Sequence, residues 1–60
     1  MSDIEKRDIV QKAISAARLV HLELASRLAK AINNFLNKAI TFEFLYKIYL
    51  EVPLTIRSRL

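Results

Sequence analysis

The 60-residue sequence contains no cysteine and no glycine, and it has one proline and one histidine. Without cysteine, the chain has no disulfide, no thiolate nucleophile and no cysteine-based zinc site. Without glycine, it lacks the backbone turns that a P-loop, a dinucleotide-binding loop or a nucleophile elbow requires. A single histidine excludes a multi-histidine metal site within one chain. We therefore expect a protein without enzymatic activity, cofactor or bound metal.

Long hydrophobic runs are also absent. The longest stretch without a charged side chain covers residues 31–37, and it is far shorter than the roughly 20 apolar residues that a membrane-spanning helix needs. The first eight residues contain no apolar segment of the kind found in signal peptides. These observations predict a cytoplasmic protein with no membrane contact.

Basic residues exceed acidic ones, ten against six, which gives a net charge of +4. Such an excess suits contact with phosphates or acidic partners, although no run of five or more basic residues forms a basic arm. One polar helical strip carries basic and amide side chains and no acidic ones, and such side chains can hold phosphates and read base edges. An ordinary solvated surface is the alternative interpretation. The candidate nucleic-acid contacts are Arg27, Lys30, Asn34 and Lys38 on this strip, with Arg57 and Arg59 near the C-terminus.

The N-terminal part of the chain has the pattern of one long helix. Ser2 and Glu5 form a capping box, in which a serine hydroxyl and a glutamate three residues later satisfy the first free amide groups of a helix. No glycine or proline interrupts the chain before Pro53. The apolar period then continues without a break, so the sequence predicts a single helix over about residues 3–36.

Two apolar stripes follow this predicted helix. The first has the alternating four- and three-residue spacing of a heptad seam, and we expect it to form an oligomer interface. Its members are Val10, Ile14, Ala17, His21, Leu24, Leu28, Ala31 and Phe35. The second lies beside it and widens the apolar face; its members are Leu22, Ala25, Ala29, Ile32, Leu36 and Ala39.

The C-terminal third allows two interpretations. Asn37 is the best candidate for a left-handed helix stop in a chain without glycine, and Thr41 can cap a second helix over about residues 42–51. Apolar and polar residues also alternate over residues 40–52, which is typical of a β-strand. A helix is favoured because a lone strand would have no partner in the chain. Residues 53–60 are expected to form a short extended tail.

Length predicts self-association. A helix over residues 3–36 would measure about 51 Å at ~1.5 Å per residue, whereas a compact domain of this size has a radius of gyration of only ~10 Å. Most of the seam would stay in contact with water unless a second chain covered it. We therefore expect an all-α helical hairpin that associates into a homodimeric bundle of four helices, with parallel and antiparallel pairing both open.

These expectations define one domain over residues 1–60 and two candidate functions. The first is a self-associating helical interaction module, either an adaptor or a small structural subunit of a larger assembly. The alternative is a small basic dimer that binds DNA or RNA. The expected partners are a second copy of the chain, another protein or a nucleic acid.

Overall fold

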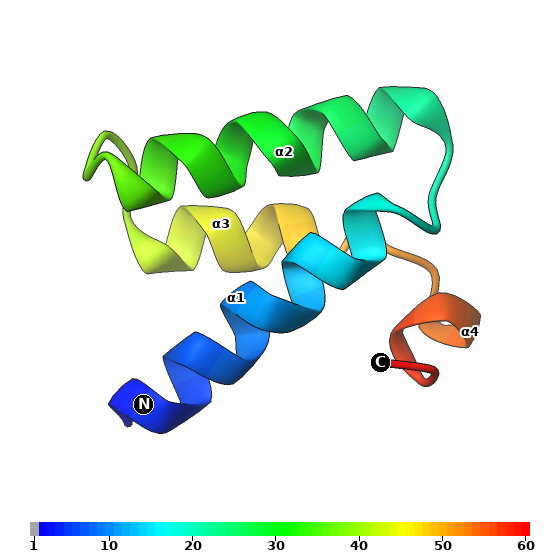
Figure 1. The fold of residues 1–60 in the computed structure, drawn as a ribbon, viewed down its shortest axis with the longest axis horizontal. Coiled ribbons are helices and arrows are strands. Elements are labelled where there is room, and N and C mark those ends of the chain that lie inside the picture. Colours follow the sequence, from blue (N-terminus) through cyan, green and yellow to red (C-terminus); the bar gives the residue numbers. More distant parts are fainter. Residues whose placement is uncertain (1) are drawn as a thin grey trace.

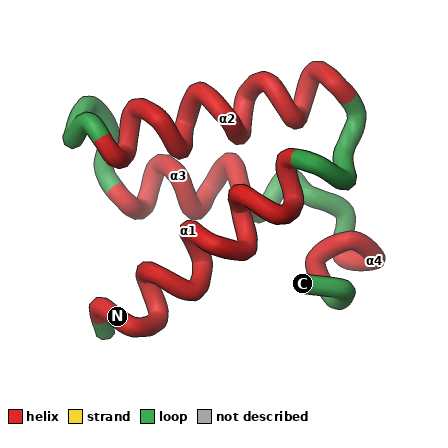
Figure 2. Tube along the Cα trace, viewed as in Figure 1, coloured by secondary structure: helices red, strands yellow, loops and turns green. Residues whose placement is uncertain are grey.

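The computed structural model describes residues 2–60, and it contains four helices and no strand in this range. They are α1 (Asp3–Ala17), α2 (Leu22–Leu36), α3 (Phe42–Tyr49) and α4 (Leu54–Arg57). Figure 2 shows the helices joined by short loops. The all-α prediction is confirmed, and the alternative of a β-strand over residues 40–52 is wrong.

Two predicted helix starts are confirmed by their hydrogen bonds. The Glu5 amide donates to the Ser2 hydroxyl oxygen at 3.3 Å. The Phe44 amide donates to the Thr41 hydroxyl oxygen, also at 3.3 Å. Both caps satisfy amide groups that have no partner within the first turn of a helix, so α1 and α3 begin where the local sequence indicates.

The single helix predicted over residues 3–36 is wrong, because the chain turns at residues 18–21. The amides of Arg18 and Leu19 donate to carbonyls only three residues earlier, at 3.2 and 2.9 Å, which tightens and ends α1. His21 then takes an extended conformation, with φ −60° and ψ 154°, and α2 starts after it.

Tertiary packing explains the turn at residues 18–21, which the local sequence does not predict. Ala13 and Ala16 on α1 are fully buried in the same core cluster as Leu28 on α2, and Val20 in the turn packs against this cluster. A straight helix would hold residues 13 and 28 about 22 Å apart at ~1.5 Å per residue, so it could not bring them together. Helix propensity is a weak preference that tertiary packing overrides.

The end of α2 has a left-handed residue one position later than predicted. Asn37 has φ −88° and caps the helix, whereas Lys38 has φ 62°. The Lys38 amide donates to the Phe35 carbonyl at 3.0 Å, and the Ala39 amide donates to the Asn34 carbonyl at 2.7 Å. This is the hydrogen-bond pattern of a Schellman motif, formed here on a lysine because the chain has no glycine.

The C-terminal segment is helical rather than extended. Helix α3 ends at Tyr49, and α4 forms one turn after Pro53. The Arg57 guanidinium Nε donates to the Val52 carbonyl at 3.0 Å, which ties α4 to the preceding loop. The expectation of an extended tail over residues 53–60 is therefore corrected, because proline starts a helical turn here instead of preventing one.

Helix α2 is the centre of the fold. In Figure 1, α2 runs along the top with α3 beneath it, and α1 crosses the molecule diagonally. Leu28, Leu45 and Val52 are the largest fully buried side chains, and Ala13 and Ala16 of α1 are buried with them, so the core lies among α1, α2, α3 and the loop after α3. The radius of gyration is 10.6 Å. Because the chain folds back on itself at this size, the length argument for self-association loses its premise.

Candidate interaction surface

The predicted interface seam packs largely inside the single chain. Leu28 and Ala31 are buried in the core cluster. Five other members of the seam are partly buried and pack against that cluster: Val10, Ile14, Ala17, Leu24 and Phe35. The turn at residues 18–21 folds α1 onto α2, so the chain itself covers the seam that a second chain was expected to cover.

His21, the remaining member of the seam, is exposed. It is the N-cap of α2, and its side chain makes no capping hydrogen bond. It lines a hollow of about 290 Å³ together with Leu24, Glu51 and Ile56. His21 thus lies in the turn before α2 rather than within a helix, and its place in an oligomer interface stays a prediction.

Much of the second apolar stripe stays open, although Ile32 is buried in the core cluster. Leu22 is 82% exposed and Leu36 is 64% exposed, at the two ends of α2. Between them lies an open groove of about 500 Å³, which we name the α1–α2 groove. It is lined by Ile14, Ala17, Arg18, Leu22, Ala25, Ser26, Ala29, Ile32, Asn33 and Leu36.

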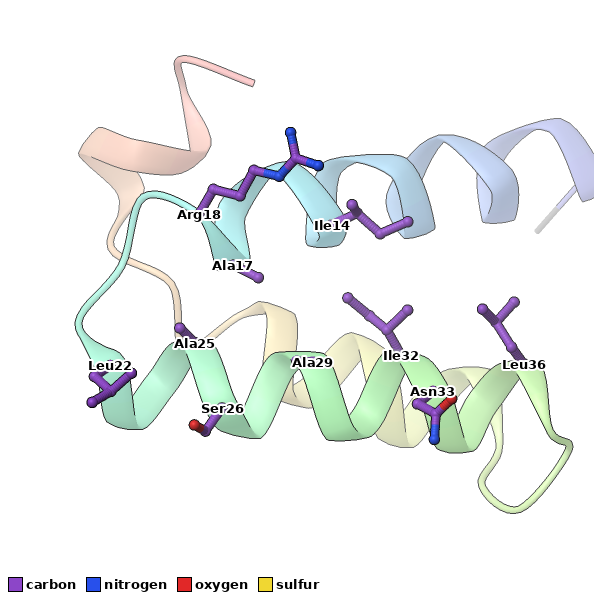
Figure 3. A pocket seen from close by; sticks show the side chains of 10 residues that line it. All are labelled: Ile14, Ala17, Arg18, Leu22, Ala25, Ser26, Ala29, Ile32, Asn33 and Leu36. Atoms are coloured by element: carbon purple, nitrogen blue, oxygen red, sulfur yellow. The ribbon is translucent and has the colours of Figure 1, made fainter.

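Figure 3 shows how the two helices form this groove. Ala25, Ile32 and Leu36 extend from α2 toward α1, while Ser26 and Asn33 point away from it. Positions 17, 25 and 29 carry alanine, whose small side chain fills little of the groove between the two leucines at its ends. The arrangement presents a mainly apolar floor with polar side chains along its outer edge.

A second hollow continues the surface beyond Leu36. It measures about 540 Å³ and shares Leu36 with the α1–α2 groove. Val10 and Phe35 contribute apolar surface, and three charged residues, Asp3, Lys6 and Arg7, stand around it. The apolar surface of the groove therefore reaches a charged border near the start of α1.

The strip predicted for nucleic-acid contacts lies on the other side of α2. Arg27, Lys30 and Asn34 line a hollow of about 270 Å³ between α2 and α3, in which Phe44 is also exposed. Both terminal nitrogens of Arg27 donate to the Glu51 carboxylate, at 2.6 and 2.9 Å. The strip is therefore not free of acidic residues, because α3 ends close enough to place Glu51 on it.

The other predicted nucleic-acid contacts are scattered. Lys38 occupies the left-handed position after α2, Arg57 is bonded to the loop before α4, and Arg59 is exposed. The hollow between α2 and α3 brings together Arg27, Lys30 and Asn34 of the predicted set, and it is not lined by Lys38, Arg57 or Arg59.

Two further charged contacts lie on α1. Lys12 Nζ is 3.1 Å from an Asp8 carboxylate oxygen, and this hydrogen bond, with the charge of Asp8, raises the pKa of Lys12. Lys6 Nζ lies 5.7 Å from the centre of the Phe42 ring, in cation–π geometry. Both contacts hold charged side chains against the surface of α1 and α3.

In the sequence, the α1–α2 groove corresponds only to the second apolar stripe, which was interpreted as widening one face of a single helix.

Within residues 2–60, there is no group of three or more histidine, aspartate or glutamate side chains that could hold a metal ion. No helix in that range is long and apolar enough to cross a membrane. Comparison with protein-family models, curated proteins and solved structures finds no match to this chain.

Proposed function

We propose that the protein is a helical interaction module that associates with a second copy of itself through the α1–α2 groove. The observation that carries the proposal is the exposure of Leu22 and Leu36 at the two ends of an apolar groove. Contiguous exposed apolar surface on a small domain marks an interaction site, whereas single exposed apolar residues are common on any protein surface. Fully burying one leucine side chain contributes roughly 1.5–3 kcal/mol.

The proposed dimer is a bundle of four helices, but it uses helices other than those the sequence suggested. Two copies that face each other through their grooves contribute α1 and α2 each, while α3 stays behind α2 in the core of its own subunit. Closed dimers with two-fold symmetry are the commonest form of homo-oligomer. As such a dimer, the protein would act as an adaptor or as a small structural subunit of a larger assembly.

Nucleic-acid binding finds weaker support. The two Arg27–Glu51 hydrogen bonds occupy the one arginine of the strip, so reading a base edge with Arg27 would require breaking them. A cheap measurement separates the two functions: affinity for duplex DNA as the salt concentration changes. A steep loss of affinity with salt would favour the nucleic-acid function, because contacts to phosphates release counterions.

Light scattering at different protein concentrations tests the proposal. We expect the unaltered chain to reach the mass of a dimer at micromolar concentration, and Leu22→Asp to remain a monomer. Leu22 is the first residue of α2, where an aspartate interacts favourably with the helix dipole, so the substitution should preserve the fold.

Leu54→Asp is the matched control. Leu54 is also an exposed leucine at the first position of a helix, but it lies on α4 and lines neither hollow of the proposed surface. This variant should dimerise like the unaltered chain. A monomeric mass for the unaltered chain at every concentration would refute the proposal, and dissociation by Leu54→Asp alone would move the interface to α4.

A further inference from the structure

We propose that the chain has a second folded form, a domain-swapped dimer, in which residues 18–21 join α1 and α2 into one continuous helix. In this form α1 leaves its own α2 and α3 and packs on the same two helices of a second copy. The inference goes beyond the proposed function, because it involves the buried face of α1 and does not require the α1–α2 groove.

The turn between α1 and α2 departs only briefly from helical geometry. Arg18 still has helical backbone angles, φ −87° and ψ −12°, and α2 begins at Leu22. The departure therefore lies within residues 19–21, none of which is glycine or proline. No residue in this turn would prevent a helix from passing through it.

The turn also leaves backbone amide groups without a partner in the protein. Within residues 2–60, the amides of residues 20–24 donate no hydrogen bond to a backbone carbonyl, and the side chain of His21 makes no capping bond to them. These amides must therefore bond to water. A continuous helix would pair each of them with the carbonyl four residues earlier, so it supplies backbone hydrogen bonds that the folded-back chain lacks.

A second copy lets the chain combine a continuous helix with the observed core. Ala13 and Ala16 are fully buried in the same cluster as Leu28, and a straight helix would carry them away from the Leu28 of their own chain. In the swapped dimer, each α1 fills the site that the other α1 has left. That site is already complementary to α1, because α1 occupies it in the single chain. Exchange of an identical element is a low-cost route to a dimer, and short connecting loops favour it.

A distance measured within one chain tests the proposal. Glu5→Cys and Asn34→Cys are combined in one chain and spin-labelled; both sites are exposed, and the chain has no other cysteine. This chain is refolded at high concentration with an excess of unlabelled chain, so that most labelled dimers carry a single labelled copy. Gel filtration then separates the dimer from the monomer.

The two forms predict different distances between the labels. In a continuous helix, residues 5 and 34 lie about 44 Å apart at ~1.5 Å per residue. The folded-back chain measures only 26 Å along its longest axis. We expect pulsed electron paramagnetic resonance to give the long distance in the dimer fraction and a distance within the size of the folded-back chain in the monomer fraction.

His21→Pro should remove the swapped dimer and preserve the folded-back chain. The φ of −60° at His21 suits proline, and the His21 amide donates no backbone hydrogen bond within residues 2–60. Inside a continuous helix, proline would lose a hydrogen bond and clash with the preceding turn, so we expect dimerisation to weaken at least ~100-fold. His21→Ala is the matched control: it also removes the imidazole, but alanine favours a helix, so this variant should dimerise at least as strongly as the unaltered chain.

Leu36→Lys separates this inference from the proposed function. It alters one end of the α1–α2 groove, while a basic residue at the last position of α2 suits the helix dipole. A dimer that His21→Pro abolishes and Leu36→Lys retains supports the swap. The opposite response, or a dimer with the short label distance, would overturn the inference and leave the groove as the interface. A monomeric mass at every concentration would overturn both, and if His21→Pro does not fold by circular dichroism, the label distances decide alone.

Discussion

Leu28 and Leu22 lie on the same helix and belong to stripes with the same kind of apolar spacing, yet their surroundings differ completely. Leu28 is fully buried among the residues of the core cluster, whereas Leu22 is 82% exposed. The face of α2 that contains Leu28 is covered by the chain itself, and the face that contains Leu22 borders an open groove. Periodicity thus identifies an apolar face, but the path of the chain decides whether that face is covered.

The largest predicted effect is the difference in stability when the same substitution, leucine to alanine, is made on the buried and on the open face of α2. Leu28→Ala should lower the free energy of unfolding by about 2–5 kcal/mol, because it leaves a cavity in the core. Leu36→Ala, on the open face, should change the unfolding of the monomer by no more than about 0.5 kcal/mol. Urea denaturation at a concentration below that of dimerisation measures both values.

A second variant at position 28 keeps this comparison informative if Leu28→Ala does not fold. Leu28→Met conserves volume, so it should fold and lose less than about 1.5 kcal/mol. Equal losses for Leu28→Ala and Leu36→Ala would contradict the difference in burial between the two faces.

A smaller effect is expected from the ion pair that joins α2 to the end of α3. Arg27 and Glu51 form two hydrogen bonds, but both side chains are substantially exposed. We expect a coupling energy of roughly 0.2–1 kcal/mol, because water screens exposed pairs. A double-mutant cycle with Arg27→Gln and Glu51→Gln measures it by thermal unfolding. A coupling as large as the loss in Leu28→Ala would show that charge, rather than burial, holds α3 against α2.

The smallest effect should arise on α1, from the pair of Asp8 and Lys12. Asp8 raises the pKa of Lys12 in the folded state, so the stabilisation is present below the ordinary lysine value of 10.5 and is lost as the pH rises through the higher folded value. Asp8→Asn should remove this alkaline decline from the melting temperature. Glu43→Gln, which alters an exposed acid that forms no ion pair within residues 2–60, should retain this decline.

The sequence predicted those parts of the fold that depend on neighbouring residues. The caps at Ser2 and Thr41 and the end of α2 at Leu36 follow from local hydrogen bonds and local turn chemistry. The turn at residues 18–21 could not be predicted in this way, because it contains no helix-breaking residue and depends on the burial of Ala13 and Ala16.

The candidate surface was only partly predictable for the same reason. Its stripe, from Leu22 to Leu36, was recognised as apolar, but the stripe containing Leu28 was assigned to the interface. The two stripes could not be ranked without knowing that α1 folds back. In the same way, the strip around Arg27 looked free of acids because Glu51 is distant in the sequence and close only in the fold.

The alanine side chains buried in the core limit which substitutions this protein can accept during evolution. Ala13 and Ala16 are fully buried on α1 within the core cluster, so any added methyl group must push α1 away from its neighbours or strain a side chain. Overpacking of this kind typically costs 1–3 kcal/mol, a large share of the stability that a chain of this size can have. Descendants of this sequence should therefore vary more freely at exposed residues outside the α1–α2 groove, while alanine persists at these two sites.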